Sequence, residues 1–143
     1  MYVEVAARRS GKTTRLIDDL IEYIDITNKP VYLVSAYIIS WDNIIDQVPE
    51  EYKSLVIKPP KTQYHPEIKT YWDEADLCDP IYQRYQDTGY YTGTPGNGFL
   101  KKLVKYNNGE YTKFAWTGDE KSIKEMKGTI SEESFRREIL AEL

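Results

Sequence analysis

The stretch Ala6-Ala7-Arg8-Arg9-Ser10-Gly11-Lys12-Thr13 decides the fold. Residues 2–6 alternate and then become apolar, which predicts a short strand that runs directly into the glycine and the lysine. From Thr13 to about Asp25, apolar residues recur at helical spacing, which predicts an amphipathic helix. A strand, a tight turn and a helix in direct succession are the building unit of an α/β protein.

The rest of the chain repeats this alternation of strand and helix patterns. Strands are predicted at 31–35, 54–57, 68–72, 89–95 with a closing turn, and 111–116. Helical segments are predicted at 38–47, 81–86, 99–106 and 131–143, with a proline-containing loop at 58–67. Together these patterns predict a three-layer α/β sandwich with a mainly parallel central sheet of about five strands.

Length and composition are those of one globular domain. The chain has 143 residues, 29% of them charged and 41% hydrophobic, so we expect a single domain over 1–143. The net charge of −4 argues against a stand-alone nucleic-acid binder, which usually carries a basic surplus. A single cysteine forms no internal disulfide, and no apolar run has signal-peptide or transmembrane length. We therefore expect a cytoplasmic protein with no membrane partner.

The turn after the first strand has the composition of a phosphate-binding loop. Gly11-Lys12-Thr13 matches the end of that motif, although Ala6 stands where the motif has its first glycine. Gly11 allows the backbone N–H groups to point at oxygen atoms, Lys12 reaches the β- and γ-phosphates, and the Thr13 hydroxyl coordinates Mg²⁺. The alternative is a chance match in an ordinary turn. We expect the phosphate contacts to come from Arg9, Ser10, Gly11, Lys12, Thr13 and Thr14.

An acidic pair, Asp73-Glu74, closes the strand predicted at 68–72. One carboxylate at such a place can hold Mg²⁺, and its neighbour can act as general base toward an attacking water. Adjacent side chains at a strand end point in different directions, so the two can divide these tasks. The alternative is that residues 73–76 form an acidic loop that faces solvent.

The turn Thr92-Gly93-Thr94-Pro95 follows the next strand. Small hydroxyl residues on a tight turn can respond to a γ-phosphate and move the segment attached to them. A simple glycine-proline turn is the alternative for this motif taken alone. The order of phosphate loop, acidic pair and hydroxyl turn favours a functional interpretation of all three.

With these motifs the chain resembles the ATPase domain of phage terminase large subunits, the motors that pump DNA into viral capsids. The resemblance rests on Ala7-Arg8-Arg9-Ser10-Gly11-Lys12-Thr13-Thr14, on Trp72-Asp73-Glu74-Ala75 and on Thr92-Gly93-Thr94-Pro95. That family tolerates a replaced first glycine and often has an early arginine in the loop, as Arg8 is here. Residues 131–140 are similar to the helix that leaves the terminase ATPase core.

The resemblance implies a RecA-like P-loop fold, Mg²⁺ as cofactor and ATP as substrate. It implies that Lys12 and Thr13 bind triphosphate and magnesium in a Walker A loop, and that Asp73 is the Walker B magnesium ligand. It further implies the catalytic base Glu74, a charge-stabilising Arg8 and a coupling motif formed by Thr92, Gly93, Thr94 and Pro95. Because the chain runs from Met1 to Leu143, we expect a minimal stand-alone form that lacks the nuclease domain of the family.

Several partners and rival functions stay open beside this resemblance. DNA contact is expected through a partner or through the basic cluster Lys101, Lys102 and Lys105, for which a solvated helix face is the alternative. Further copies of the chain or a viral assembly partner, in the host cytoplasm, are also expected. Rival functions are a nucleotide-binding assembly or regulatory module without turnover, and one half of a helicase-like motor. The arginines considered as fingers across a subunit boundary are Arg84, Arg136 and Arg137, and spacing does not choose among them.

Overall fold

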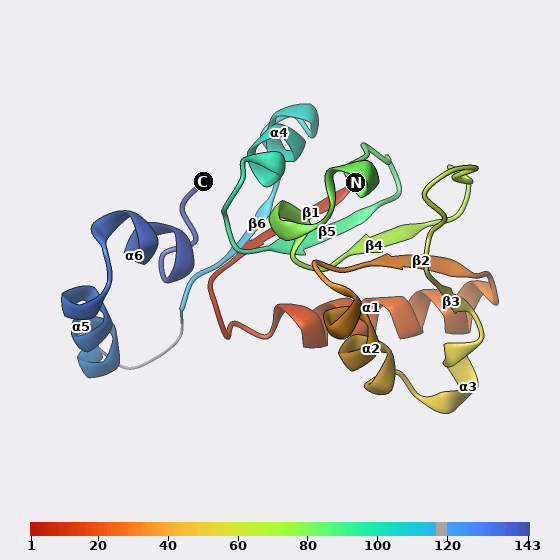
Figure 1. Ribbon diagram of the computed structural model, residues 1–143, viewed down its shortest axis with the longest axis horizontal. Helices are drawn as coiled ribbons and strands as arrows, with labels where there is room; N and C mark the ends of the chain where they lie inside the picture. The colour runs from red at the N-terminus through yellow and green to blue at the C-terminus, as the bar shows by residue number, and fades with distance from the viewer. Residues whose placement is uncertain (117–119) are drawn as a thin grey trace.

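The computed structural model describes residues 1–116 and 120–143, and it is built on one parallel sheet (Figure 1). Six strands pair in the order β3-β2-β4-β5-β1-β6, and every pair is parallel. The strands are β1 (Tyr2–Ala6), β2 (Val31–Val34), β3 (Val56–Ile57), β4 (Thr70–Trp72), β5 (Tyr90–Gly93) and β6 (Thr112–Phe114). The predicted α/β class and parallel sheet are therefore confirmed, with six strands where about five were expected.

Helices cover both faces of the sheet. The helices of the described residues are α1 (Lys12–Thr27), α2 (Ile38–Asp46), α3 (Glu50–Lys53), α4 (Phe99–Tyr106), α5 (Glu120–Thr129) and α6 (Glu132–Glu138), with 3₁₀ turns at Ala75–Leu77 and Pro80–Tyr82. Figure 1 shows α1 and α2 on one face and α4 on the other. This arrangement agrees with the three predicted layers.

Alternation along the strands explains the two faces. In β4 and β5, Trp72 and Tyr91 pack in the cluster that contains α4, whereas Tyr71 and Tyr90 pack in the cluster that contains α1. Successive side chains of a strand point to opposite faces, so strands covered on both sides are apolar at nearly every position. The indole of Trp72 stacks on the ring of Tyr91 at 4.2 Å between centroids.

Several element boundaries differ from the predictions. Strand β3 is limited to Val56–Ile57, because Ser54 ends the short helix α3, which was not predicted. The helix predicted at 131–143 ends at Glu138, because the chain reverses at Ala141 (φ 54°) and Glu142 N–H donates to the carbonyl of Arg136. Helix α5 was also not predicted.

The segment predicted as helical at 81–86 forms only the 3₁₀ turn Pro80–Tyr82. Its last residue, Gln86, is buried and accepts a hydrogen bond from the Thr70 N–H at 2.8 Å. The Gln86 amide also donates to the Ile68 carbonyl at 2.8 Å. These contacts bind Gln86 to the start of β4, so the segment is extended there instead of continuing a helix.

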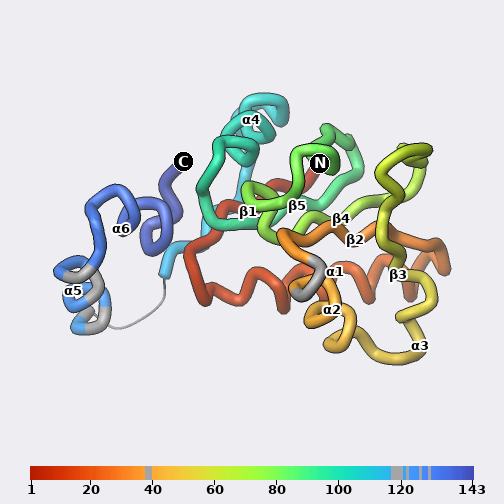
Figure 2. The backbone as a smooth tube through the Cα atoms, viewed as in Figure 1, coloured from red at the N-terminus to blue at the C-terminus, as the bar shows by residue number. Residues whose placement is uncertain are grey.

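The sheet brings three loops to one edge. Because all strands are parallel, the loops after β1, β4 and β5 leave from the same carboxyl edge, where α/β proteins place their ligands. Strand β5 lies between β1 and β4, so the segment after Gly93 stands between the other two loops. Helices α5 and α6 stand beside this part of the molecule, apart from the helices that cover the sheet faces (Figure 2).

No helix among residues 1–116 and 120–143 is long and apolar enough to cross a membrane.

Candidate functional site

The loop between β1 and α1 has the backbone of an anion site. Gly11 caps α1 in the left-handed conformation (φ 81°), and Arg9 is also left-handed (φ 55°). The Ser10 hydroxyl donates to the Ala7 carbonyl at 2.7 Å and closes the turn. The first N–H groups of α1 therefore face the space above the loop, where the helix dipole favours negative charge.

Alanine at the first motif position is compatible with this loop. Ala6 and Ala7 are fully buried at the end of β1, and neither has a positive φ. The Ala7 N–H donates to the Phe114 carbonyl at 2.7 Å, which extends the pairing of β1 with β6 by one residue. No conformation here requires glycine, so the methyl group of Ala6 fills core space at no backbone cost.

Thr13 faces the first acidic residue. The Thr13 hydroxyl lies 3.4 Å from each carboxylate oxygen of Asp73, although the two residues are 60 apart in sequence. Asp73 is buried, and its N–H donates to the Val34 carbonyl at 2.9 Å. Burial, followed by the charge of Glu74, raises the pKa of Asp73 to about 6.

These oxygen atoms fit a magnesium ion that arrives with phosphates. A hydroxyl and a carboxylate are the hard donors that Mg²⁺ prefers, and Mg²⁺ usually takes only one or two protein ligands beside substrate phosphates. Among the described residues, no three acidic, histidine or cysteine side chains form a metal cluster. Thr13 and Asp73 are therefore the side chains that would hold the ion.

The second acidic residue pairs with the lysine of the loop. Lys12 Nζ lies 2.9 Å from a carboxylate oxygen of Glu74, and both side chains are mostly buried. Glu74 adopts the left-handed conformation (φ 52°), which is costly for a residue with a β-carbon. This backbone turns the Glu74 side chain toward the loop while Asp73 remains in line with β4.

Gly93 makes room for that turn. A β-carbon on Gly93 would lie 3.0 Å from the Ala75 nitrogen and 3.4 Å from the Glu74 Cα. The end of β5 thus approaches the backbone of the acidic pair as closely as a glycine permits. The predicted coupling turn and the predicted base are in direct contact.

Asp76 holds the segment that follows the predicted coupling turn. It is 1% exposed, and its carboxylate accepts hydrogen bonds from the N–H groups of Gly96 (2.7 Å), Gly98 (3.3 Å) and Leu100 (2.6 Å). The alternative that residues 73–76 form a solvent-facing loop is therefore wrong, because Asp73 and Asp76 are both buried. Asp76 was not predicted as a site residue. Its partners are backbone N–H groups, which every residue has, so no sequence pattern indicates them.

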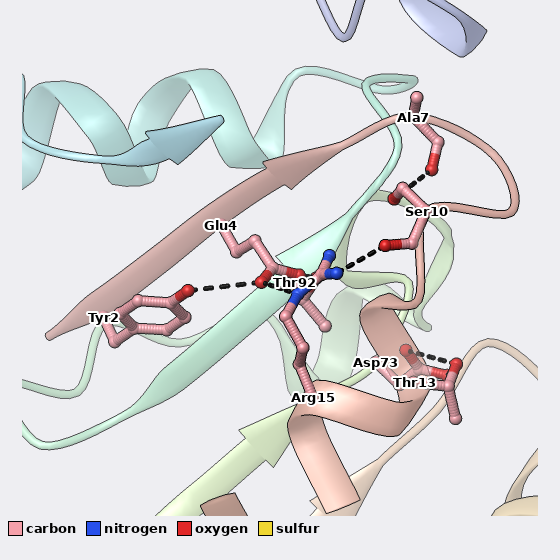
Figure 3. A network of polar contacts seen from close by, with 8 residues as sticks. All are labelled: Tyr2, Glu4, Ala7, Ser10, Thr13, Arg15, Asp73 and Thr92. Atoms are coloured by element: carbon pink, nitrogen blue, oxygen red, sulfur yellow. Dashed lines mark hydrogen bonds and ion pairs between the residues drawn. The ribbon is translucent and has the colours of Figure 1, made fainter. Parts of the chain in front are cut away.

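A buried ionic network lies behind the phosphate loop (Figure 3). Glu4 on β1 is fully buried and accepts from Arg15 Nε at 2.7 Å, from the Tyr2 hydroxyl at 3.2 Å and from the Thr92 hydroxyl. Arg15 also donates to the Ser10 carbonyl. Sequence reasoning missed this network, although an acidic residue within an otherwise apolar buried strand is a usable signal.

A cavity of about 450 Å³ opens in front of the loop. It brings together the predicted Arg8, Arg9, Lys12, Glu74, Thr94 and Pro95, and adds Arg137 and Glu138 of α6 with Leu77, Gly96 and Asn97. Arg8 is half exposed, and its guanidinium lies 3.6 Å from the Glu138 carboxylate. Thr14 is exposed in the first turn of α1 and does not line this cavity.

Two further features lie away from the motif residues. The exposed Lys101, Lys102 and Lys105 are on α4, outside the cavity. A larger and mainly apolar cavity of about 600 Å³ lies at the end of β2, beside Tyr37 and Trp41. We assign the chemistry to the smaller cavity, because its lining includes the charged groups that a phosphate requires and Lys12 at the start of α1. Thr13 and Asp73 lie outside this lining.

Comparison of the chain with protein-family models, with curated proteins and with solved structures finds no match. The geometry of the site and the three motifs therefore indicate what the chain does.

Proposed function

We propose that this chain is a magnesium-dependent, ATP-binding and ATP-hydrolysing protein of the RecA-like P-loop class, similar to the motor ATPases of viral DNA packaging. One observation carries the proposal. Two motifs 60 residues apart meet at the carboxyl edge of the sheet, with Thr13 facing Asp73 at 3.4 Å and Lys12 facing Glu74 at 2.9 Å. A chance Gly-Lys-Thr turn has no reason to meet an acidic pair in this register.

Each side chain has a task in this reaction. The loop N–H groups and Lys12 bind the β- and γ-phosphates, while Thr13 and Asp73 hold the ion. When bound, Mg²⁺ neutralises the charge that develops on the phosphate oxygens. Glu74 orients a water toward the γ-phosphorus and accepts its proton, while the bond from that phosphorus to the bridging oxygen breaks and ADP leaves.

Because of the Lys12–Glu74 ion pair, Glu74 can act as a base only when substrate is bound. While the two groups are 2.9 Å apart, the carboxylate is engaged by the lysine and not by a water. A triphosphate offers Lys12 more negative charge than Glu74 does, so binding draws the lysine away and releases the carboxylate. Hydrolysis then requires a filled site.

The same ion pair supports the rival function, a nucleotide-binding module without turnover. If Lys12 remains on Glu74 when nucleotide binds, the carboxylate never meets a water. The module then binds and releases ATP unchanged, and acts through the segments attached to the loop.

Turnover and binding measured together separate the two functions. The experiment measures phosphate release with Mg²⁺ and ATP, and equilibrium binding of ATP, for wild type, Lys12→Ala and Glu74→Gln. The proposal expects wild-type turnover, loss of binding in Lys12→Ala, and retained binding without turnover in Glu74→Gln. Lys29→Ala and Glu110→Gln, at exposed positions, serve as matched controls and are expected to behave as wild type.

Binding by wild type without turnover would identify the module. Unchanged hydrolysis in both site variants would overturn the site assignment, and absence of nucleotide binding by wild type would overturn the proposal as a whole.

A further inference from the structure

One backbone hydrogen bond joins helix α6 to the phosphate loop, and another joins the residue after α6 to the segment that follows β6. The Arg8 N–H donates to the Glu138 carbonyl at 2.8 Å, and the Trp116 N–H donates to the Ile139 carbonyl at 2.8 Å. Phe135 and Ile139 are buried, so α6 is packed in place and does not merely lie on the surface. The structure thus holds α6 at the mouth of the cavity in front of the loop.

Arg137 on this helix has the environment of an anion ligand. It lines the cavity together with Arg8, Arg9 and Lys12. Its Nε is buried and has no hydrogen-bond partner among the described residues. A buried charged donor without a partner is costly, and in a cavity lined by other cations a bound anion would satisfy it.

The neighbouring residue Arg136 differs from Arg137 in its exposure and in its partner. Arg136 is exposed, and its guanidinium lies 2.9 Å from Glu132 one turn earlier on the same helix. Arg136 therefore has an ordinary surface partner, whereas Arg137 has no ion-pair partner among residues 1–116 and 120–143. Of the two adjacent arginines, only Arg137 lines the cavity.

The charges of the cavity leave room for an anion. Its lining has four basic side chains and two acidic ones. Lys12 pairs with Glu74 and Arg8 with Glu138, whereas Arg9 and Arg137 form no ion pair within the described part of the chain. The unbalanced positive charge suits a group that carries two or more negative charges, such as the terminal phosphates of a nucleotide.

We propose that Arg137 binds the terminal phosphate of the nucleotide in cis, so that α6 completes the site within a single chain. This inference rests on the proposed nucleotide site. The planar guanidinium donates two parallel hydrogen bonds to phosphate oxygens, which a lysine ammonium does not reproduce. Since the terminal phosphate leaves on hydrolysis, the contact exists with ATP and is lost with ADP.

The first test compares Arg137→Gln, Arg137→Lys and the control Arg136→Gln in binding of ATP and ADP. Arg137→Gln is expected to weaken ATP binding about 10- to 100-fold and to leave ADP binding nearly unchanged. Arg137→Lys is expected to recover part of the loss, and Arg136→Gln to match wild type. Equal affinities for ATP in wild type and Arg137→Gln would overturn the inference while leaving the proposed function intact.

A second test asks whether the arginine acts within its own chain. Lys12→Ala and Arg137→Gln, each inactive or weak alone, are mixed in equal amounts and assayed for turnover. Action in cis gives only the sum of the two separate activities. Recovery of turnover in the mixture would mean that Arg137 reaches the site of a second copy, which would overturn the inference.

A third measurement avoids substitution and covers the case in which Arg137→Gln folds poorly. Amide hydrogen exchange of residues 131–143 is followed in wild type with ADP and with a non-hydrolysable ATP analogue. Slower exchange with the ATP analogue than with ADP is expected, because only the analogue has the terminal phosphate that Arg137 binds. Identical exchange with both ligands would contradict the contact. If wild type binds neither nucleotide, both this inference and the proposed function are wrong.

Discussion

The Thr92 hydroxyl on β5 donates a hydrogen bond to the Glu4 carboxylate on β1, and both side chains are fully buried. The same carboxylate holds Arg15 at 2.7 Å, and Arg15 donates to the Ser10 carbonyl in the phosphate loop. The strand that carries the predicted coupling turn is thus joined to the loop through two charged side chains (Figure 3). If either β5 or the loop shifts, the hydrogen bonds of Glu4 and Arg15 must change, and the other segment is affected.

Glu4→Gln is expected to lower the free energy of unfolding by about 3 kcal/mol, because it leaves the Arg15 guanidinium without its buried counter-charge. Chemical denaturation followed by circular dichroism measures the change. Glu132→Gln breaks the exposed pair with Arg136 and serves as the control, with an expected loss below about 1 kcal/mol. Equal effects of the two substitutions would contradict the buried network.

Gly93→Ala is expected to reduce ATP turnover about 100-fold while nucleotide binding persists, because the added methyl group pushes the Glu74 backbone away from its position. Phosphate release and ATP binding are the measurements. Gly109→Ala is a matched control: Gly109 has a φ of 81°, and a methyl group added there would meet no atom within 4 Å, so only local strain is introduced. Wild-type turnover in Gly93→Ala would show that Glu74 does not depend on this approach.

Asp76→Asn is expected to cost about 2–3 kcal/mol of unfolding free energy and to loosen the turn after β5, because an amide replaces a charged acceptor of three backbone N–H groups. Denaturation and amide exchange of residues 94–100 measure the two effects. Asp87→Asn, at an exposed aspartate, is expected to cost less than about 1 kcal/mol. A stable variant with unchanged exchange would remove Asp76 from the support of the coupling turn.

Chelation of Mg²⁺ is expected to abolish turnover, and Asp73→Asn to raise the Mg²⁺ concentration for half-maximal turnover at least about 10-fold. The reason is that Asp73 is the carboxylate facing Thr13. A magnesium titration of phosphate release measures the shift, with the exposed Asp18→Asn as control. Coinciding titrations for wild type and Asp73→Asn would take Asp73 out of the metal site.

Replacing Lys101, Lys102 and Lys105 together by Gln is expected to remove any stimulation of turnover by DNA and to leave basal turnover unchanged. These exposed side chains are on α4, directly after the coupling turn, and each phosphate contact contributes a salt-dependent gain in affinity. The measurement is turnover against DNA concentration at two salt concentrations. Undiminished stimulation in the triple variant would favour the alternative, a solvated helix face.

Sequence predicts the parts of this protein that local pattern determines. The strand, loop and helix around Gly11 follow from short-range periodicity and turn chemistry, and helix α4 has the predicted bounds. The meeting of Lys12 with Glu74 was predictable in outline, since parallel strands end at one edge. The 2.9 Å ion pair itself was not, because it depends on the left-handed backbone of Glu74.

The residues missed by sequence reasoning have partners that only tertiary packing supplies. Arg15 meets Glu4 after α1 packs on the sheet, and Asp76 accepts from backbone groups 20 to 24 residues ahead. Arg137 was named from sequence only as one of three candidate arginines, with Arg84 and Arg136, because no spacing shows which of them lines the cavity. Such contacts depend on the path of the chain between them, which local pattern does not encode.

The pairing of β1 has a consequence for the order in which the protein forms. Strand β1 is synthesised before both strands that pair with it: β5, which ends at Gly93, and β6, which begins at Thr112. A nascent chain that ends before Tyr90 therefore contains the phosphate loop sequence but neither strand that flanks it. Closing such distant pairs is entropically slow. We expect nucleotide to bind only after β6 has left the ribosome, so that ligand capture follows the pairing of β1 with both of its neighbours.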